Sequence, residues 1–470
     1  MQHFPIEIDR KAKTPLSAQI YAAIRDAILD RRLASGARLP SWNDLAAQLG
    51  VARGMVRAAY ERLNDEQLTV AHGASGTRVV ERIAPQHKPA ADATAHALRA
   101  DLFRDFGRPP LTFQMGVPAQ DAFPFGLWSR LMARHARDAA AALVSYPDPR
   151  GEETLRSALC AYMAIARGVK CSPEQVVVTG GFAGALGLAL RALPLRGDGA
   201  WVEDPGFPLT RDALAIAGLA RHAVPVDGEG LDSAEGRRRA PSAALAVVTP
   251  GQQAPLGVIM SLARRMALLR WASDARAFIV EDDYLGELQL DGRAAPALAS
   301  LDRDGRVIYA GTFSKTISPS LRLGFLIVPP QLSTRFAEAA ASLAPAPSPL
   351  TQRAVAAFIA EGHFLRHLRR MKRLYAARRR ALLDNLRAVA GDDAPATTCG
   401  LDVLLRLPDD VDDRDIAARA YGAGFAPTAL SPWVAGALAA QGLLLGATNL
   451  SERRLAADCA ELWKIIRAPS

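Results

Sequence analysis

Short apolar runs of strand type alternate with amphipathic helical segments over most of the chain, from Leu111 onward. A helix between two consecutive strands lets those strands run parallel in one sheet, with helices covering both faces. The pattern therefore predicts an α/β fold built on a largely parallel sheet. The strand-type runs cover residues 175–179, 200–203, 244–249, 277–281, 306–310 and 324–328.

The chain divides into three zones, which predict a multi-domain protein. Residues 1–80 hold short helical segments followed by a Gly-rich hairpin. Residues 81–110 show weak periodicity and are expected to form a linker. Residues 111–470 carry the alternation of strands and helices, and a length of 470 residues is ample for more than one buried core.

The composition predicts a cytoplasmic protein without a metal site. The formal net charge of +9 is compatible with polyanion binding but does not establish it at this length. Residues 1–10 lack the apolar segment of a signal peptide, and no apolar run is long enough to span a bilayer. The four cysteines form no CxxC pair, which favours reduced thiols. They are Cys160, Cys171, Cys399 and Cys459.

The N-terminal zone has the pattern of a winged helix-turn-helix. Residues 16–31 carry apolar side chains at four-residue steps, and Ser41 can cap a second helix over 42–49. Gly50 and Val51 then make a tight turn before a third helix over 52–64. Residues 71–79 are predicted to form a β-hairpin wing.

These elements predict a set of DNA contacts. Arg53 and Arg57 lie near the start of the third helix, where a recognition helix meets base edges or phosphates. The wing offers Arg78 and its backbone amides to the flanking phosphates. A helical protein-interaction module with a solvated basic face is the alternative. The predicted DNA-contact residues are Ser41, Arg53, Arg57, Gly76, Thr77 and Arg78.

Residues 16–79 resemble the winged helix-turn-helix of the GntR superfamily. The resemblance is carried by residues 34–41, 49–53, 58–63 and 73–77. Trp42-Asn43 and Ala52 to Met55 depart from the residues usual in that family, which removes polar side chains suited to phosphate and base contacts. The resemblance implies double-stranded operator DNA as a partner, with a sequence preference different from that of typical relatives.

A lysine on a hydroxyl-rich loop is the main chemical signal of the larger zone. Lys315 follows a predicted strand in Gly311-Thr312-Phe313-Ser314-Lys315, and Arg322 lies seven residues later. A lysine amine can form a Schiff base with an aldehyde, and hydroxyls with an arginine suit a phosphate dianion. Pyridoxal phosphate carries both groups. The alternative is a solvated loop at a strand end.

Further loops offer partners for such a cofactor. Asp282 and Tyr284 are alternate residues at the end of a buried strand and would face the same side, although a metal-binding or solvated loop is the alternative. The amides of Gly181 and Phe182 would form an anion seat at a helix N-terminus. Phe207 could stack on a ring, and Tyr146 offers a phenol. Each loop alone is weak evidence, and their order along one chain carries the prediction.

Residues 111–465 resemble the fold-type I, class I/II aminotransferases, and the whole chain resembles MocR/GabR-type transcriptional regulators. The shared segments are 146–151, 201–208, 281–284, 311–315 and 361–364. The resemblance implies a dimer and a smaller α+β C-terminal subdomain over about 361–470. It implies that Lys315 forms the internal aldimine, that Asp282 pairs with the pyridinium nitrogen and that Tyr284 bonds the phenolic oxygen. It further implies stacking by Phe207, phosphate contacts from Thr312, Ser314, Arg322, Gly181 and Phe182, and Tyr146 reaching in from the partner subunit.

Three positions depart from that resemblance. Ala254 replaces a side chain that would orient the cofactor, and Leu256 stands where some relatives have a polar ligand contact. Leu444 occupies the expected position of the arginine that grips a substrate carboxylate. We therefore expect weak or no transamination of ordinary amino acids.

The combined pattern predicts a cytoplasmic, homodimeric transcriptional regulator that holds pyridoxal phosphate and senses a small amine. Two alternatives stay open. One is an active aminotransferase with a DNA-binding appendage, and the other is a DNA-binding dimer whose large domain has lost the cofactor. The basic helix over 364–386 could be a second DNA surface, but packing with a solvated face is the simpler interpretation.

Overall fold

The computed structural model divides into two compact units, whose described residues lie within 6–80 and 108–468. The described residues are 6, 8–12, 14–30, 32–71, 76–80, 108–141, 146–197, 199–292, 294–343, 346–391, 395–436 and 441–468. The tip of the predicted wing (72–75) and most of the predicted linker (81–107) lie outside them. Among the described residues, no helix combines the length and apolar character needed to cross a membrane.

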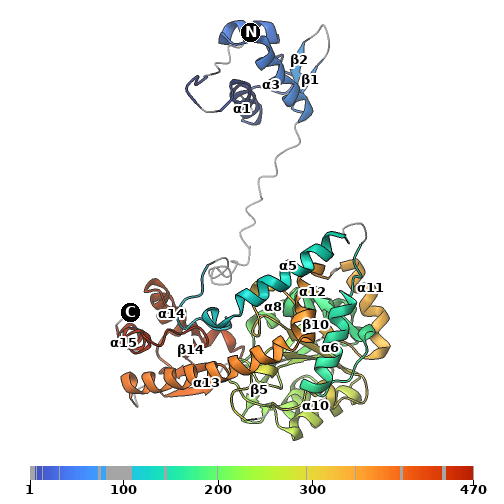
Figure 1. Cartoon of the computed structure of the whole chain (residues 1–470), viewed down its shortest axis with the longest axis vertical. Coiled ribbons are helices and arrows are strands. Elements are labelled where there is room, and N and C mark those ends of the chain that lie inside the picture. Colours follow the sequence, from blue (N-terminus) through green and yellow to red (C-terminus); the bar gives the residue numbers. More distant parts are fainter. Residues whose placement is uncertain are drawn as a thin grey trace. The chain divides into compact units, whose positions relative to one another are not determined.

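The first unit is a winged helix-turn-helix, as predicted (Figure 1). It contains α1 (Leu16–Leu29), α2 (Trp42–Leu49) and α3 (Arg53–Asp65), followed by the antiparallel pair β1 (Thr69–Ala71) and β2 (Thr77–Val79). The Ser41 hydroxyl caps α2 by accepting the N–H of Asp44 at 3.1 Å. Ile20, Ile24 and Ile28, spaced one helical turn apart, are buried in the core of this unit.

A mixed eight-stranded sheet forms the centre of the second unit. Its strands lie in the order β3-β10-β9-β8-β7-β4-β5-β6. The five strands from β9 to β5 are parallel, whereas β10 runs antiparallel to both of its neighbours. The strands are β3 (Val176–Thr179), β4 (Gly199–Asp204), β5 (Ala220–Asp227), β6 (Gly230–Leu231), β7 (Leu245–Val248), β8 (Phe278–Asp283), β9 (Val307–Thr312) and β10 (Gly324–Ile327).

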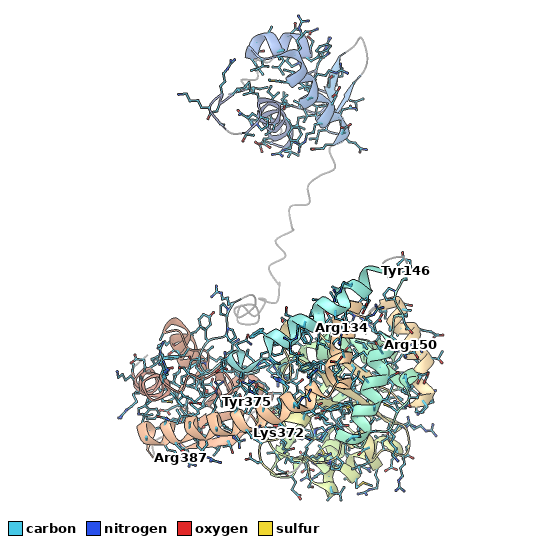
Figure 2. All side chains as sticks on the ribbon, viewed as in Figure 1. Arg134, Tyr146, Arg150, Lys372, Tyr375 and Arg387 are labelled. Atoms are coloured by element: carbon cyan, nitrogen blue, oxygen red, sulfur yellow. The ribbon has the colours of Figure 1, made fainter. Side chains whose placement is uncertain are left out.

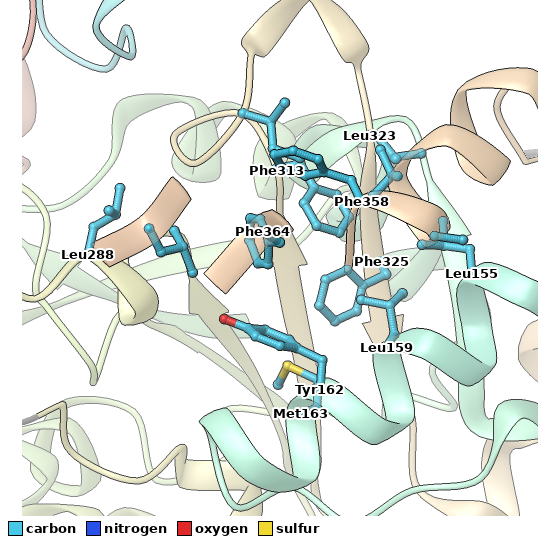
Figure 3. Close-up of a cluster of buried hydrophobic side chains, with 14 of the residues drawn as sticks. Leu155, Leu159, Tyr162, Met163, Leu288, Phe313, Leu323, Phe325, Phe358 and Phe364 are labelled. Atoms are coloured by element: carbon cyan, nitrogen blue, oxygen red, sulfur yellow. The ribbon is translucent and has the colours of Figure 1, made fainter. Parts of the chain in front are cut away.

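Helices cover both faces of this sheet, because alternate strand residues point to opposite sides. Along β3, Val176 and Val178 pack in one buried cluster and Val177 packs in another. Figure 3 shows the first cluster, where Phe313 and Phe325 meet aromatic and aliphatic side chains of the covering helices. The helices are α5 (Phe125–Ala141), α6 (Glu153–Ala166), α7 (Gly181–Ala192), α8 (Pro208–Ile216), α9 (Ser233–Arg239), α10 (Leu262–Asp274), α11 (Ser333–Leu343) and α12 (Pro349–Ala360).

The long helix α13 (His363–Ala390) leads from the large sheet to a smaller α+β subdomain (Figure 1). That subdomain has an antiparallel sheet in the order β11-β12-β14-β13. Arg378 and Arg379 of α13 are buried and bond Asp121 and Asp291, so this part of the basic helix is used in packing. The other elements are β11 (Ala396–Cys399), β12 (Asp402–Arg406), α14 (Asp413–Gly422), β13 (Thr428–Ala429), β14 (Gly442–Gly446) and α15 (Leu455–Arg467).

Candidate functional site

The position of β10 brings two loops that are distant in the sequence, the β3–α7 loop and the β9–β10 loop, to the same end of the large sheet. Gly324, its first residue, pairs with Thr179 at the end of β3 and with Thr312 at the end of β9. The loop leading into α7 and the loop carrying Lys315 therefore start side by side. Arg322 lies two residues before Gly324, in the same β9–β10 loop as Lys315. The sheet order thus assembles residues that are more than a hundred positions apart in the chain.

Lys315 lies on the loop after β9 and is half-buried. Its Nζ donates to the carbonyl oxygen of Gly116 at 2.8 Å. A side chain at residue 116 would collide with this amine, because a Cβ built there would lie 2.3 Å from Nζ. Burial lowers the pKa of Lys315, while the nearby carboxylates of Asp402 and Asp282 act in the opposite direction. The lowered pKa favours a neutral, nucleophilic amine.

Asp282 is separated by the strand alternation from the two acids beside it. The carboxylate of Asp283 bonds the Arg167 Nε at 2.7 Å and the Tyr309 hydroxyl at 2.8 Å. Glu281 accepts the backbone N–H groups of residues 298 and 299. Both of these acids are therefore used in hydrogen bonds inside the protein core. Asp282 faces the other side, where it is 7% exposed and its Oδ1 has no hydrogen-bond partner.

The surroundings of Asp282 disfavour its charge. Burial raises the pKa of Asp282 well above its ordinary value, and the charges of Asp283 and Glu203 add to that rise. The charge of Lys315 acts in the opposite direction. A buried carboxylate with an unpartnered oxygen would be stabilised by a cation or a proton donor placed against it.

Aromatic side chains lie beside this carboxylate. Phe207 and Asp282 line one cavity, and Phe207 packs against Trp433 of the small subdomain with ring centroids 5.6 Å apart. Tyr284 follows β8 and packs in the same apolar cluster as Phe207. Burial raises the pKa of the Tyr284 phenol, and Asp402 and Asp282 contribute to the rise. The phenol is therefore a hydrogen-bond donor at neutral pH.

The part of the site formed by the β9–β10 loop and the start of α7 is suited to an anion. Thr312 donates to the Ser314 hydroxyl at 3.0 Å, and the N–H of Ser314 donates to the Thr312 hydroxyl. The guanidinium of Arg322 donates to the carbonyl of Gly180 at 3.1 Å, next to Gly181. The helix α7 begins at Gly181 and Phe182 with no side-chain cap and no acid in its first turn. Its first N–H groups are therefore available to a negative charge.

These residues fit the chemistry of pyridoxal phosphate. The amine of Lys315 suits the aldehyde, and the unpartnered oxygen of Asp282 suits the ring N–H. The uncapped N-terminus of α7, with the hydroxyls and Arg322, suits the phosphate. All the predicted cofactor residues except Tyr146 are brought to this edge or its neighbouring cluster.

Tyr146 lies apart from the other predicted cofactor residues. Its side chain is fully exposed, at 101%, and it is found at the outer edge of the second unit (Figure 2). Within a single chain it contacts none of the groups around Lys315 in the hydrogen bonds and ring contacts of the described residues. Its predicted role requires a second subunit.

The three departures from the aminotransferase pattern meet in one place. Ala254, Leu256 and Leu444 belong to a single apolar cluster that also contains Phe207 and Tyr284. Leu444 is fully buried and pairs with Leu404 across the small sheet. The position where the resemblance would place a carboxylate-binding arginine is therefore surrounded by apolar side chains.

Two groups at the site escaped the sequence reasoning. Gly116 supplies the carbonyl that holds Lys315, and Asp402 at the start of β12 lies close enough to affect the pKa of Lys315. A single acid opening the apolar run Val403-Leu404-Leu405 was the available signal for Asp402. Gly116 gave no comparable signal, because its role is a backbone contact.

The predicted DNA-contact residues lie in the first unit. Arg53 is exposed at the first residue of α3, and Arg57 is exposed and bonds Glu61 at 2.8 Å one turn away. Arg78 donates to the carbonyl of Gly36 at 3.0 Å, and the hydroxyl of Ser41 is used in the cap of α2. Gly76 and Thr77 lie where the chain enters β2.

Comparisons with known proteins agree with this two-part organisation. Residues 120–404 match the family Aminotransferase class I and II, and residues 16–79 match the bacterial regulatory proteins of the gntR family. The probable rhizopine catabolism regulatory protein MocR of Rhizobium meliloti is 37% identical in an alignment of 435 positions that covers 89% of this chain and 88% of that protein. The pyridoxine biosynthesis transcriptional regulator PdxR of Corynebacterium glutamicum is 31% identical in an alignment of 470 positions that covers 97% of each chain.

A solved structure is similar to the second unit. The α-aminoadipate aminotransferase LysN of Thermus thermophilus, in complex with N-(5'-phosphopyridoxyl)-L-leucine, aligns with a TM-score of 0.68 and 27% identity. The alignment covers 76% of this chain and 92% of that one. The chain therefore belongs to the MocR/GabR-type transcriptional regulators, in which a GntR-type winged helix-turn-helix is joined to a domain of the class I and II aminotransferase fold.

Proposed function

We propose that this regulator binds pyridoxal phosphate through Lys315, senses a small amine at the same site and binds operator DNA as a cytoplasmic homodimer. The observation that carries the proposal is that two groups with unused bonding capacity, the Lys315 amine and the Asp282 carboxylate, lie at the same end of neighbouring strands. The Lys315 amine bonds only a backbone carbonyl among its described contacts, and a buried oxygen of Asp282 has no partner. A ring with an aldehyde and a protonated nitrogen would satisfy both.

The residues of this chain have distinct roles in the proposal. When bound, the cofactor supplies an aldehyde carbon that bonds a primary amine. Lys315 presents an amine whose lowered pKa favours the neutral form. Asp282 holds a proton on the ring nitrogen, and the Tyr284 phenol donates to the oxygen beside the aldehyde. Phe207 covers the ring face, and Arg322 with the start of α7 binds the phosphate.

The route from the site to the rest of the second unit passes through residues 113–119. Phe113 forms an isolated bridge with Gly446 of β14, and Thr448 bonds the carbonyl of Val117. The N–H of Ala119 donates to Tyr375 of α13 at 3.0 Å. Gly116, between these anchors, holds the Lys315 amine. An amine that takes the place of Lys315 at the cofactor would release the lysine amine to this carbonyl, so a shift of the small subdomain is the proposed signal.

The homodimer is supported by Tyr146. A fully exposed phenol in a predicted site segment fits a role in the site of a second copy. The proposed contacts with operator DNA are Arg53 and Arg57 on α3, Arg78, Gly76 and Thr77 of the wing, and Ser41 at the start of α2.

The test of the cofactor proposal is the visible absorbance of the purified full-length protein. We expect a band from a lysine-bound cofactor that disappears in Lys315→Ala and persists in the control Lys464→Ala, whose lysine pairs with Glu461 at 3.1 Å on an outer helix. After borohydride reduction, peptide mass spectrometry should find the pyridoxyl group on Lys315. A modification on another lysine, or no band in the wild type after addition of pyridoxal phosphate, would contradict the proposal.

A further inference from the structure

Asp402 is a buried acid that the proposed cofactor contacts leave unused. It is the first residue of β12 and is 8% exposed. Its Oδ1 has no hydrogen-bond partner, whereas the backbone N–H of Ala447 interacts with the carboxyl group. Asp402 pairs with Gly446 across the small sheet, and Gly446 bridges Phe113, three residues before the Gly116 that holds the Lys315 amine. The charge of Asp402 also acts on the pKa of both Lys315 and Tyr284.

The cations near Asp402 are already engaged elsewhere. The guanidinium of Arg379 bonds Asp291 at 2.6 Å and the carbonyl of Gly400. The amine of Lys315 bonds Gly116. Neither forms an ion pair with Asp402 among the described residues. The carboxyl group is therefore left with an acceptor oxygen in dry surroundings, which is a costly state unless a further donor is supplied.

The walls around this acid are apolar. Cys399 and Leu404, its neighbours in the small sheet, pack with Leu430, Leu444 and Trp433. Ala254 and Leu256 of the large domain belong to the same cluster. Apolar side chains of this kind suit the methylene groups of an aliphatic chain. A ligand carboxylate would meet hydrocarbon at Leu444 and would be repelled by Asp402.

We propose that Asp402 binds the second ammonium group of an aliphatic diamine whose first amine is the group sensed at Lys315. This inference rests on the function proposed above and narrows the ligand class within it. The diamine places one nitrogen at the cofactor, its methylene chain against the apolar cluster and its second nitrogen at the unpartnered Oδ1 of Asp402. The acid thereby selects diamines over monoamines and amino acids.

The protonation of Asp402 makes this selection dependent on pH. Burial raises the pKa of Asp402 to about 7, opposed by Lys315 and Arg379. The other titratable groups that interact with it are the Tyr284 phenol and the Cys399 thiol, and burial raises the pKa of each. Below about pH 7 the acid is increasingly neutral, so the advantage of a diamine over its matched monoamine should shrink between pH 8 and pH 6.

The test titrates full-length protein loaded with pyridoxal phosphate by isothermal calorimetry and by its visible spectrum. The probes are 1,3-diaminopropane, 1,4-diaminobutane and 1,5-diaminopentane, each beside the monoamine and the amino alcohol of the same chain length, with 4-aminobutanoate as the carboxylate probe. We expect at least one diamine to bind about 10-fold or more tightly than its monoamine and amino alcohol, the usual effect of a charged hydrogen bond. If no diamine has this advantage, or 4-aminobutanoate binds as tightly, the inference is wrong.

The variant Asp402→Asn separates recognition from folding and from cofactor binding. It should keep the cofactor band and lose the diamine advantage while leaving monoamine affinity within about two-fold. The control Asp458→Asn removes another buried acid of the small subdomain, which pairs with Arg454, and should retain the advantage. If Asp402→Asn lowers the affinity for diamine and monoamine equally, Asp402 acts only through Lys315 and the inference is wrong. Absence of the cofactor band in the wild-type protein would instead overturn the proposed function.

Discussion

Glu203 is an acid whose pKa is shifted by its burial. It is the penultimate residue of β4, is only 5% exposed, lines the same cavity as Asp282 and accepts the N–H of Thr249 at 3.0 Å. The Thr249 hydroxyl and the Gln253 amide also donate to it. Despite these bonds, burial raises the pKa of Glu203 from 4.5 to about 7. The charged form is therefore disfavoured in the folded protein.

This shift predicts how the stability of Glu203→Gln compares with the wild type across pH. Between about pH 4.5 and 7 the folded wild type binds more protons at Glu203 than the unfolded chain does. Its free energy of unfolding therefore falls as pH rises through that window and levels off above it. Glutamine does not titrate, so the variant should gain up to about 3 kcal/mol relative to the wild type between pH 5 and pH 8.

Thermal unfolding of the cofactor-free proteins at pH 5, 6.5 and 8 measures this gain. The difference in melting temperature between Glu203→Gln and the wild type should move in favour of the variant as pH rises. The control is Glu153→Gln, an exposed acid in the first turn of α6. A constant difference across the three pH values would show that Glu203 is ionised without penalty.

At the scale of elements, the inserted strand β10 is what joins the phosphate end of the site to the lysine loop. Gly324 makes this possible because the strands and α7 approach it closely. A Cβ built on Gly324 would lie 2.8 Å from the carbonyl oxygen of Gly311 and 2.9 Å from the Cα of Gly181. Both neighbours are backbone atoms, which cannot rotate away.

Gly324→Ala should therefore destabilise the second unit by about 1–3 kcal/mol and weaken cofactor binding, because β9 and α7 must separate. The matched control is Gly187→Ala within α7, where an added Cβ meets no atom within 4 Å. That change should stabilise the helix by about 0.5–1 kcal/mol. Melting temperature and cofactor titration measure both. Unchanged cofactor affinity in Gly324→Ala would show that the phosphate seat does not depend on this contact.

The apolar runs allowed most strands of the large sheet to be predicted from the sequence. The runs at 277–281 and 306–310 correspond to β8 and β9, with ends that differ by one or two residues. The strand β5 (Ala220–Asp227) was not predicted, because it includes exposed polar residues such as Arg221. The antiparallel direction of β10 was also outside the reach of the sequence, since a run of apolar residues carries no direction.

The candidate site could be predicted where it depends on strand ends and not where it depends on tertiary contacts. Asp282 lies at the end of β8 and Lys315 follows the neighbouring strand β9, so their proximity is implied by a parallel sheet. Asp402 and Gly116 come from the small subdomain and from the segment before the sheet. Their approach to Lys315 is decided by how these parts pack, and no local periodicity reports that. The functional roles of all these residues stay predictions.

At the scale of the whole molecule, the two proposed functions belong to separate units. The predicted DNA contacts lie within residues 41–78, and the proposed cofactor and amine contacts lie between residues 116 and 444. Changes in one unit can therefore be measured against an unaltered second unit in the same full-length protein. This separation gives the test of DNA binding an internal control.

Arg53→Ala should weaken DNA binding without changing the cofactor spectrum. Arg53 is exposed at the start of α3, where loss of one arginine contact is expected to reduce affinity by about 10-fold and to reduce the salt slope by about one if the contact is a phosphate. The probe is a duplex that the wild-type protein selects from a random pool, with affinities measured by fluorescence anisotropy at several salt concentrations. The control Arg25→Ala removes an arginine of α1 that pairs with Asp26 at 2.7 Å and should bind as the wild type does. Equal affinities of Arg53→Ala and wild type would move the recognition surface away from the start of α3, because an arginine at a groove-facing N-terminus cannot be removed without cost.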